Sequence, residues 1–198
     1  HLDLNTDDYQ HENVLAQRLN LTLSQWEKRY GKEENEVTPS QRFEGVIRRA
    51  AEATGQRVVI LVDEYDKPML QTIGNETLQA AHRNLLKSFY GALKSQDQYI
   101  RFALLTGVTK FGKVSVFSDL NNLFDLSMDE RYQALCGITE EEIHTYFEAS
   151  VRQLADRQGL TEEETLARLR DQYDGYHFRQ NGIGVYNPFS LLNTFSKL

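Results

Sequence analysis

The sequence is poor in several features that mark particular classes of protein. It holds one cysteine, Cys136, which excludes an internal disulfide and favours a reducing compartment, so we predict a cytoplasmic location. No apolar run approaches the ~20 residues that cross a bilayer, and the longest, 58–62, has the length of a buried strand. We therefore expect no membrane partner.

Basic charge is also scarce. The 198 residues carry 22 Lys and Arg against 29 Asp and Glu, which gives a formal net charge of −7. This balance argues against a broad nucleic-acid or anionic-membrane surface, although it leaves room for a local basic pocket. Hydrophobic residues make up 40% and charged residues 26%, as in ordinary globular proteins, and the length suits one domain with a small lid.

The first residues indicate a polypeptide that extends further upstream. The chain begins at His1, and its methionines are Met69 and Met128. Leu2-Asp3-Leu4 has the pattern of a strand with no leader before it. We therefore expect a segment before His1.

Strand and helix patterns alternate through about residue 126. The run at 58–62 is continuously apolar, which is typical of a strand covered on both faces. The segments between strands are long enough for parallel pairing, so the predicted fold class is α/β with a three-layer, mostly parallel sheet that is incomplete at the N-terminus. We expect 58–62 and 100–105 to be direct parallel neighbours, with 2–4 on the other side of 58–62. The expected helices are 11–30, 38–55 and 76–94, and the expected strands are 2–4, 58–62, 100–105 and 123–126.

Residues 128–198 form a second predicted domain, a helical lid beside the core at 1–127. Its helices are marked by Ser/Thr-x-x-Glu boxes, in which the two side chains satisfy each other's backbone amides. A hairpin is expected around a turn at Asn181-Gly182, and a last helix starts at Pro188 and still runs at Leu198. The three boxes begin at Ser127, Thr139 and Thr161.

Two adjacent carboxylates, Asp63 and Glu64, follow directly after the buried strand. In parallel α/β sheets, ligands bind beyond the carboxyl ends of the strands. This arrangement is typical of the Walker B motif of P-loop NTPases, where one acid holds Mg²⁺ and the next orients and deprotonates the attacking water. Neighbouring residues on a strand point to opposite sides. The strand must therefore end or twist here for both acids to serve one site.

Two other interpretations of the same residues stay open. A strand that ends in a solvated acidic turn is common. A Mg²⁺-dependent nuclease could be built on Asp63, Glu64 and Asp66. That site would need a metal-binding acid on a second element and a suitably placed lysine, and the sequence identifies neither.

The segment 107–114 imitates a phosphate-binding loop. It matches G-x-x-x-x-G-K, but Val114 stands where such a loop has the Ser or Thr that ligates Mg²⁺. The β-branched residues that follow are a poor start for the helix that receives the phosphates. We interpret Thr106 or Thr109 instead as a polar sensor of the γ-phosphate beside the two acids. Lys110 is a candidate phosphate-binding cation or a solvated lysine.

Several segments taken in order resemble a known bacterial family, the AAA-ATPase-like family, which belongs to the signal-transduction ATPase branch of P-loop NTPases. The resemblance covers nearly the whole chain. The segments are Val-Ile-Leu-Val-Asp-Glu-Tyr-Asp-Lys-Pro at 59–68, Leu-Thr-Gly-Val-Thr-Lys-Phe at 105–111, Asn121-Asn122-Leu123 with Asp125, Cys-Gly-Ile-Thr-Glu-Glu-Glu at 136–142, and Tyr-Asn-Pro at 186–188.

The resemblance implies roles for the residues that match the motifs. Asp63 is then the Mg²⁺-associated acid, Glu64 the catalytic base, and Thr106 or Thr109 the sensor. It also implies a phosphate loop of the type R-x-F-G-K-S upstream of Leu2, whose lysine and serine have no counterpart in these residues. A nuclease-like domain of the restriction-endonuclease fold often follows downstream.

The function implied for the intact protein is ATP binding and hydrolysis with Mg²⁺ to regulate a downstream effector domain. ATP, a nuclease-like domain and further copies of the chain are then the expected partners. These 198 residues alone are expected to hold no cofactor. The alternative is a non-hydrolysing interaction module that keeps a degenerate NTPase fold.

Overall fold

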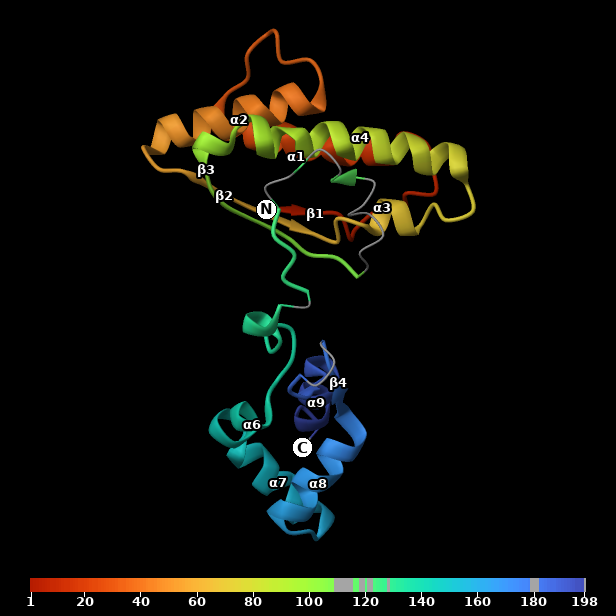
Figure 1. Cartoon of the computed structure of the whole chain (residues 1–198), viewed down its shortest axis with the longest axis vertical. Coiled ribbons are helices and arrows are strands. Elements are labelled where there is room, and N and C mark those ends of the chain that lie inside the picture. Colours follow the sequence, from red (N-terminus) through yellow and green to blue (C-terminus); the bar gives the residue numbers. More distant parts are fainter. Residues whose placement is uncertain (109–115, 118–119, 121–122, 128, 179–181, 198) are drawn as a thin grey trace. The chain divides into compact units, whose positions relative to one another are not determined.

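The chain folds into two units, divided in sequence between residues 123 and 124 (Figure 1). The sequence predicted this boundary after residue 127. The structure is a computed structural model that describes residues 1–108, 116–117, 120, 123–127, 129–178 and 182–197.

The first unit contains a small parallel sheet. It contains β1 (Leu2–Asp3), β2 (Val58–Asp63) and β3 (Ile100–Leu105), in the order β1-β2-β3. Both pairs are parallel, as predicted, with Val62 opposite Leu2 on one side and opposite Leu105 on the other. The C-terminal ends of all three strands therefore meet at one edge of the sheet.

The fourth predicted strand is wrong, because residues 123–126 form no strand. Phe124 in its middle is 64% exposed. A run of four residues is too short for its apolar pattern to specify a strand unless a neighbouring strand offers a ladder.

Three long helices cover one face of the sheet (Figure 1). The predicted capping box at the start of α2 is confirmed: the Thr38 hydroxyl accepts the Gln41 amide, and the Gln41 side chain accepts the Thr38 amide. The same helix ends at Gly55, which has a φ of 65°. The helices of this unit are α1 (Val14–Tyr30), α2 (Pro39–Thr54), the short α3 (Lys67–Leu70) and α4 (Glu76–Ser95), followed by a 3₁₀ turn at Asp97–Tyr99.

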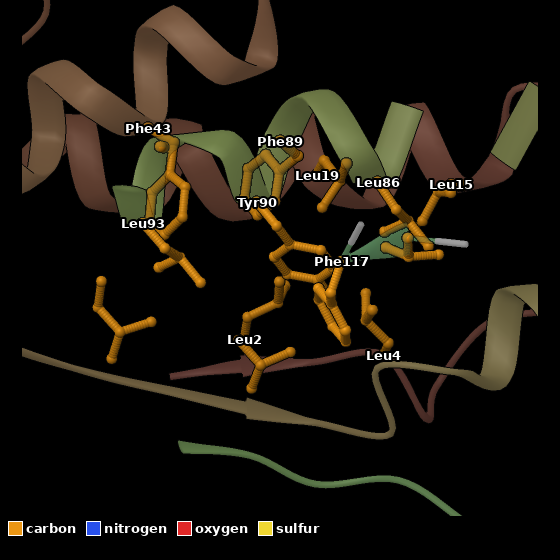
Figure 2. Close-up of a cluster of buried hydrophobic side chains, with 14 of the residues drawn as sticks. Leu2, Leu4, Leu15, Leu19, Phe43, Leu86, Phe89, Tyr90, Leu93 and Phe117 are labelled. Carbon is orange, nitrogen blue, oxygen red and sulfur yellow. The ribbon is translucent and has the colours of Figure 1, made fainter. Parts of the chain in front are cut away.

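The core of this unit fills the space between these helices and the sheet, as Figure 2 shows. Phe43 of α2 stacks on Phe89 of α4 with ring centroids 4.5 Å apart. Leu2 and Val62 contribute from the strands. Their removal from water is the main force that holds the helices on this face.

The other face of the sheet is bare within the described residues. Val59, Leu61 and Phe102 point to this face and are 51%, 40% and 51% exposed. No strand among the described residues pairs with the outer edge of β3. The chain is thus an α/β protein with a small parallel sheet, and the third layer stays a prediction for the whole polypeptide.

The second unit is helical and has its own core, which includes Ile143, Leu154, Leu169 and Leu191. Capping boxes at Thr139 and Thr161 are confirmed by their reciprocal hydrogen bonds. The elements are a 3₁₀ turn at Glu130–Tyr132, α6 (Glu140–Tyr146), α7 (Glu148–Gln158), α8 (Glu162–Tyr173), the antiparallel pair β4 (Asp174–Tyr176) and β5 (Val185–Tyr186), and α9 (Pro188–Phe195).

Two expectations for this unit are wrong. Ser127 caps no helix, because Asp129 accepts the Arg131 amide and starts the 3₁₀ turn instead. The last helix ends at Phe195 rather than running on to Leu198. The predicted turn at Asn181-Gly182 lies partly outside the described residues. In the described part of the chain, no helix is long and apolar enough to cross a membrane.

Candidate functional site

The two adjacent carboxylates, Asp63 and Glu64, lie where β2 ends in a turn. Glu64 has a φ of 55°, in the left-handed region that residues with a side chain rarely adopt. β2 ends at Asp63, directly before this conformation. Backbone strain of this kind concentrates at functional sites. Asp63 and Glu64 both lie at the carboxyl end of β2, where the strand gives way to a turn.

Thr106 lies beside Asp63 at the tip of the neighbouring strand. Its amide donates to the Val62 carbonyl at 2.9 Å, which continues the parallel ladder past the end of β3. Its hydroxyl donates to the Asp63 carboxylate. The structure thus brings together Asp63 and Thr106, two of the predicted site residues, which are 43 residues apart in sequence. Glu64 follows Asp63 directly in the chain, and β2 and β3 are neighbouring strands.

Asp66 is oriented differently from these acids. Its side chain is completely buried, and one carboxylate oxygen accepts the Val108 amide at 3.3 Å. The interpretation of this segment as a solvated acidic turn therefore does not describe Asp66.

Sequence reasoning missed Asp3 on β1. It is the register partner of Asp63, and Leu2 and Leu4 on either side of it are buried. In a parallel pair, register partners share a face, so Asp3 and Asp63 both lie on the face opposite the helices. The alternation of Leu2-Asp3-Leu4 was the signal, but the sequence alone does not show which strand lies next to it.

A lysine and an asparagine are hydrogen-bonded to each other at this edge of the sheet. Lys67 donates from Nζ to the Asn5 carbonyl at 2.6 Å and to the Asn5 side-chain oxygen. The Asn5 amide donates to Asp3 at 2.7 Å. These bonds tie the end of β1 to the start of α3.

The structure provides part of what the nuclease interpretation needs, but not its metal site of three acids. Asp3 is an acid on a second element, yet Asp66 is buried against a backbone amide and Lys67 is bonded to Asn5. Among the described residues, no group of three or more His, Cys, Asp or Glu side chains could hold a metal ion. The predicted nuclease triad of Asp63, Glu64 and Asp66 therefore does not assemble.

Aromatic side chains pack against the turn that follows β2. The Tyr65 ring packs on Phe117 with centroids 5.1 Å apart, and Phe117 packs on Tyr90 at 5.2 Å. Burial raises the pKa of the Tyr90 hydroxyl. Figure 2 shows Phe117 and Tyr90 within the core between α4 and the strands.

Two predicted site residues, Thr109 and Lys110, lie outside the described residues. Most of the segment 107–114 that imitates a phosphate loop lies outside them as well, and only Gly107 and Val108 are described. Thr106, the sensor candidate that lies within the described residues, is placed beside Asp63.

Comparison with known proteins identifies the family of the chain. A family model described as "Predicted AAA-ATPase" matches residues 1–117, which include all three strands and both acids. The chain belongs to this AAA-ATPase-like family.

A relative of this AAA-ATPase-like chain is the "Uncharacterized protein in vnfD 5'region" of Azotobacter chroococcum mcd 1. The two are 45% identical over 156 residues, which are 79% of this chain and 28% of the relative. The aligned region is thus less than a third of the relative's length. No solved structure matches the chain.

Proposed function

We propose that the polypeptide to which this chain belongs binds and hydrolyses ATP with Mg²⁺, and that its nucleotide state regulates a downstream effector domain. The observation that carries the proposal is the arrangement at one sheet edge. Asp63 accepts a hydrogen bond from the Thr106 hydroxyl there, and the next residue, Glu64, has a left-handed backbone conformation. Membership of the AAA-ATPase-like family supports the same chemistry.

Each residue has a distinct role in this proposal. Asp63 holds the Mg²⁺ that is bound with the nucleotide. Thr106 orients the Asp63 carboxylate and senses the γ-phosphate. Glu64 orients the attacking water and accepts its proton. Thr109 and Lys110 are proposed as a second polar contact and a cation for the phosphates.

The donor set at this edge fits Mg²⁺. Carboxylate and hydroxyl oxygens are the ligands that this hard cation prefers, and it binds through one or two carboxylates together with phosphates and water. Asp63 and Asp3 lie on the same face, and Asp63 is exposed there. When bound, Mg²⁺ would neutralise charge on the phosphates.

The phosphate-binding segment of the ATPase lies outside these residues in this proposal. Its strand would pair with the outer edge of β3, and its helix would cover Val59, Leu61 and Phe102. Burying such side chains contributes about 25 cal/mol per Å² of apolar surface. The bare face would then gain the third layer that the sequence predicts.

A second candidate function rests on that same bare face. Large exposed apolar patches mark interaction sites, so a non-hydrolysing module could use Val59, Leu61 and Phe102 to bind a partner protein. The two candidates differ in what they require of Glu64, which the interaction module does not need.

Phosphate release by the full-length protein separates them. We expect Mg²⁺-dependent ATP hydrolysis that Glu64→Gln lowers by ~10²–10⁴-fold, since that is what a general base contributes. Glu163→Gln, the same change on the exposed surface of α8, should leave the rate unchanged. No hydrolysis by the wild type, or equal rates for wild type and Glu64→Gln, would favour the interaction module.

A further inference from the structure

Asp66 has an unusual place for a carboxylate. It stands at the N-cap position of α3, yet its side chain makes no capping hydrogen bond to that helix. It is completely buried, and burying a charged group costs several kcal/mol unless it is hydrogen-bonded. One oxygen accepts the Val108 amide, 42 residues away in sequence. The Asp66 side chain therefore binds the loop after β3 and does not cap its own helix.

This contact requires a residue without a side chain at position 107, and Gly107 is such a residue. A Cβ at Gly107 would lie 2.5 Å from the Asp66 Oδ1 atom and 2.8 Å from the Tyr65 ring. Real Cβ atoms essentially never approach other atoms so closely, and Gly107 has no positive φ that would explain a glycine there. Close approach to Asp66 and Tyr65 is thus the reason for glycine at this position.

The contact between Asp66 and the loop is next to the proposed catalytic residues. Thr106 directly precedes Gly107, and its carbonyl accepts the Tyr65 amide at 2.9 Å. Glu64 is therefore flanked by two links to the end of β3: the Thr106 hydroxyl on Asp63, and the Thr106 carbonyl on Tyr65. The bond from Val108 to Asp66 adds a third link just beyond them.

We propose that Asp66 is a positioning residue, whose buried carboxylate holds the Gly107–Val108 loop against the turn after β2 and so fixes Thr106 on Asp63. The inference rests on the proposed ATPase function and names a determinant of its geometry. Asp66 touches neither nucleotide nor water in this role. It acts through Thr106 and Glu64, where a displacement of about 1 Å can lower a rate by ~10²-fold.

Asp66→Ala and Asp66→Asn in the full-length protein test the role. Asparagine keeps an oxygen that can accept the Val108 amide, whereas alanine removes it. We expect Asp66→Ala to lower kcat by ~10-fold or more with the Kd for Mg²⁺-ATP within about two-fold of wild type. Asp66→Asn should restore most of kcat. Asp156→Ala, on the exposed surface of α7, is the matched control and should change neither quantity.

Gly107→Ala provides a variant that keeps the carboxylate and disturbs the contact by adding one methyl group. It should also lower kcat, and adding it to Asp66→Ala should lower kcat by less than it does in the wild type, because one of its two steric conflicts is gone. Gly91→Ala in α4 is the control, since a Cβ there meets nothing within 4 Å.

Hydrogen exchange without nucleotide gives a measurement that is independent of activity. Asp66→Ala should accelerate exchange of the Val108 and Tyr65 amides, and Asp66→Asn should do so far less. Faster exchange with an unchanged kcat would show a structural contact only and would overturn the positioning role. A loss of nucleotide affinity equal to the loss of kcat would overturn it as well.

The proposed function can fail separately from this inference. Absence of hydrolysis in the wild type, or full activity in Glu64→Gln, removes the ATPase and the positioning role together. Activity that depends on Glu64 but is unchanged in both Asp66→Ala and Gly107→Ala removes the positioning role alone.

Discussion

Single residues at the ends of β2 and β3 decide the chemistry that this chain can support. Asp63 and Glu64 differ in backbone conformation although they are neighbours, because only Glu64 has the left-handed φ of 55°. Asp63 receives the Thr106 hydroxyl, and Asp66 is turned inward onto the Val108 amide. Three acids within four residues thus have three different environments.

Asp63 and Glu64 should separate binding from turnover in the full-length protein. Asp63→Ala removes the carboxylate proposed to hold Mg²⁺, so we expect weaker Mg²⁺-ATP binding by ~10-fold or more. Glu64→Gln keeps the size of the side chain and should bind ATP as wild type does while turnover stops. Equilibrium titration with fluorescent ATP beside a phosphate-release assay checks both. Equal losses of affinity in the two variants would contradict these roles.

His82 should make stability depend on pH. Burial lowers the pKa of its imidazole below the ordinary ~6.5, and its Nε2 atom has no hydrogen-bond partner among the described residues. Below about pH 6.5 the unfolded chain binds a proton at this site that the folded chain does not. Stability is therefore complete above that pH and falls as the pH drops through the folded pKa, by up to ~1.4 kcal/mol per pH unit.

Urea denaturation of wild type and His82→Gln at pH 7.5 and 5.5 measures this contribution. The difference in free energy of unfolding between the two proteins should shift in favour of the variant at the lower pH. The same difference at both pH values would mean that His82 binds its proton equally well in the folded chain.

At the scale of elements, buried ion pairs fix how α2 lies against its neighbours. Arg42 of α2 donates to both carboxylate oxygens of Glu27 in α1 at 2.7 Å. Arg49 of α2 pairs with Glu36, a buried acid in the preceding loop. Such pairs cost desolvation when they form, but breaking one by removing a partner is strongly destabilising. They therefore fix geometry more than they add stability.

Gly45 in α2 leaves the space that the Glu36 carboxylate occupies, which a substitution can test. A Cβ at Gly45 would lie 1.7 Å from a Glu36 carboxylate oxygen, so alanine must displace Glu36 from Arg49. Gly91→Ala in α4 meets nothing within 4 Å and should gain ~1 kcal/mol of helix propensity. We expect Gly45→Ala to be less stable than Gly91→Ala by about 2 kcal/mol or more, measured by chemical denaturation of the same chain. Equal stabilities would show that Glu36 moves aside freely.

At the scale of the whole molecule, one face of the sheet is covered by helices and the other is bare. Val59, Leu61 and Phe102 lie on the bare face. The aligned relative contains far more polypeptide than these residues, since the match spans 28% of it. The nucleotide site we propose needs phosphate contacts from polypeptide beyond these residues.

We therefore expect these 198 residues alone to bind ATP weakly or not at all. Backbone amides and the lysine of a phosphate loop normally provide most of the phosphate contacts. A titration of the isolated chain and of the full-length protein with fluorescent ATP measures the difference. Micromolar, Mg²⁺-dependent binding by the isolated chain would contradict the expectation and would turn attention back to the segment 107–114.

The sequence by itself determined the local structure of this protein and the position of its two leading acids. The Thr38 box and the apolar runs at 58–62 and 100–105 depend on neighbours a few residues away, so their patterns predicted helix and strand correctly. The alternation of helices and strands also predicted the parallel order. Where the pattern was as short as 123–126, it predicted a strand that does not form.

Only the tertiary structure decided which side chains meet at the site and which face of the sheet is covered. The partners of Asp66 and Asp3 are 42 and 60 residues away, and no local periodicity encodes such a distance. The continuous apolar run at 58–62 predicted cover on both faces, and only the structure showed that Val59, Leu61 and Phe102 are exposed within the described residues. Which carboxylate is buried, and which glycine must lie against it, depends on how the strand ends pack.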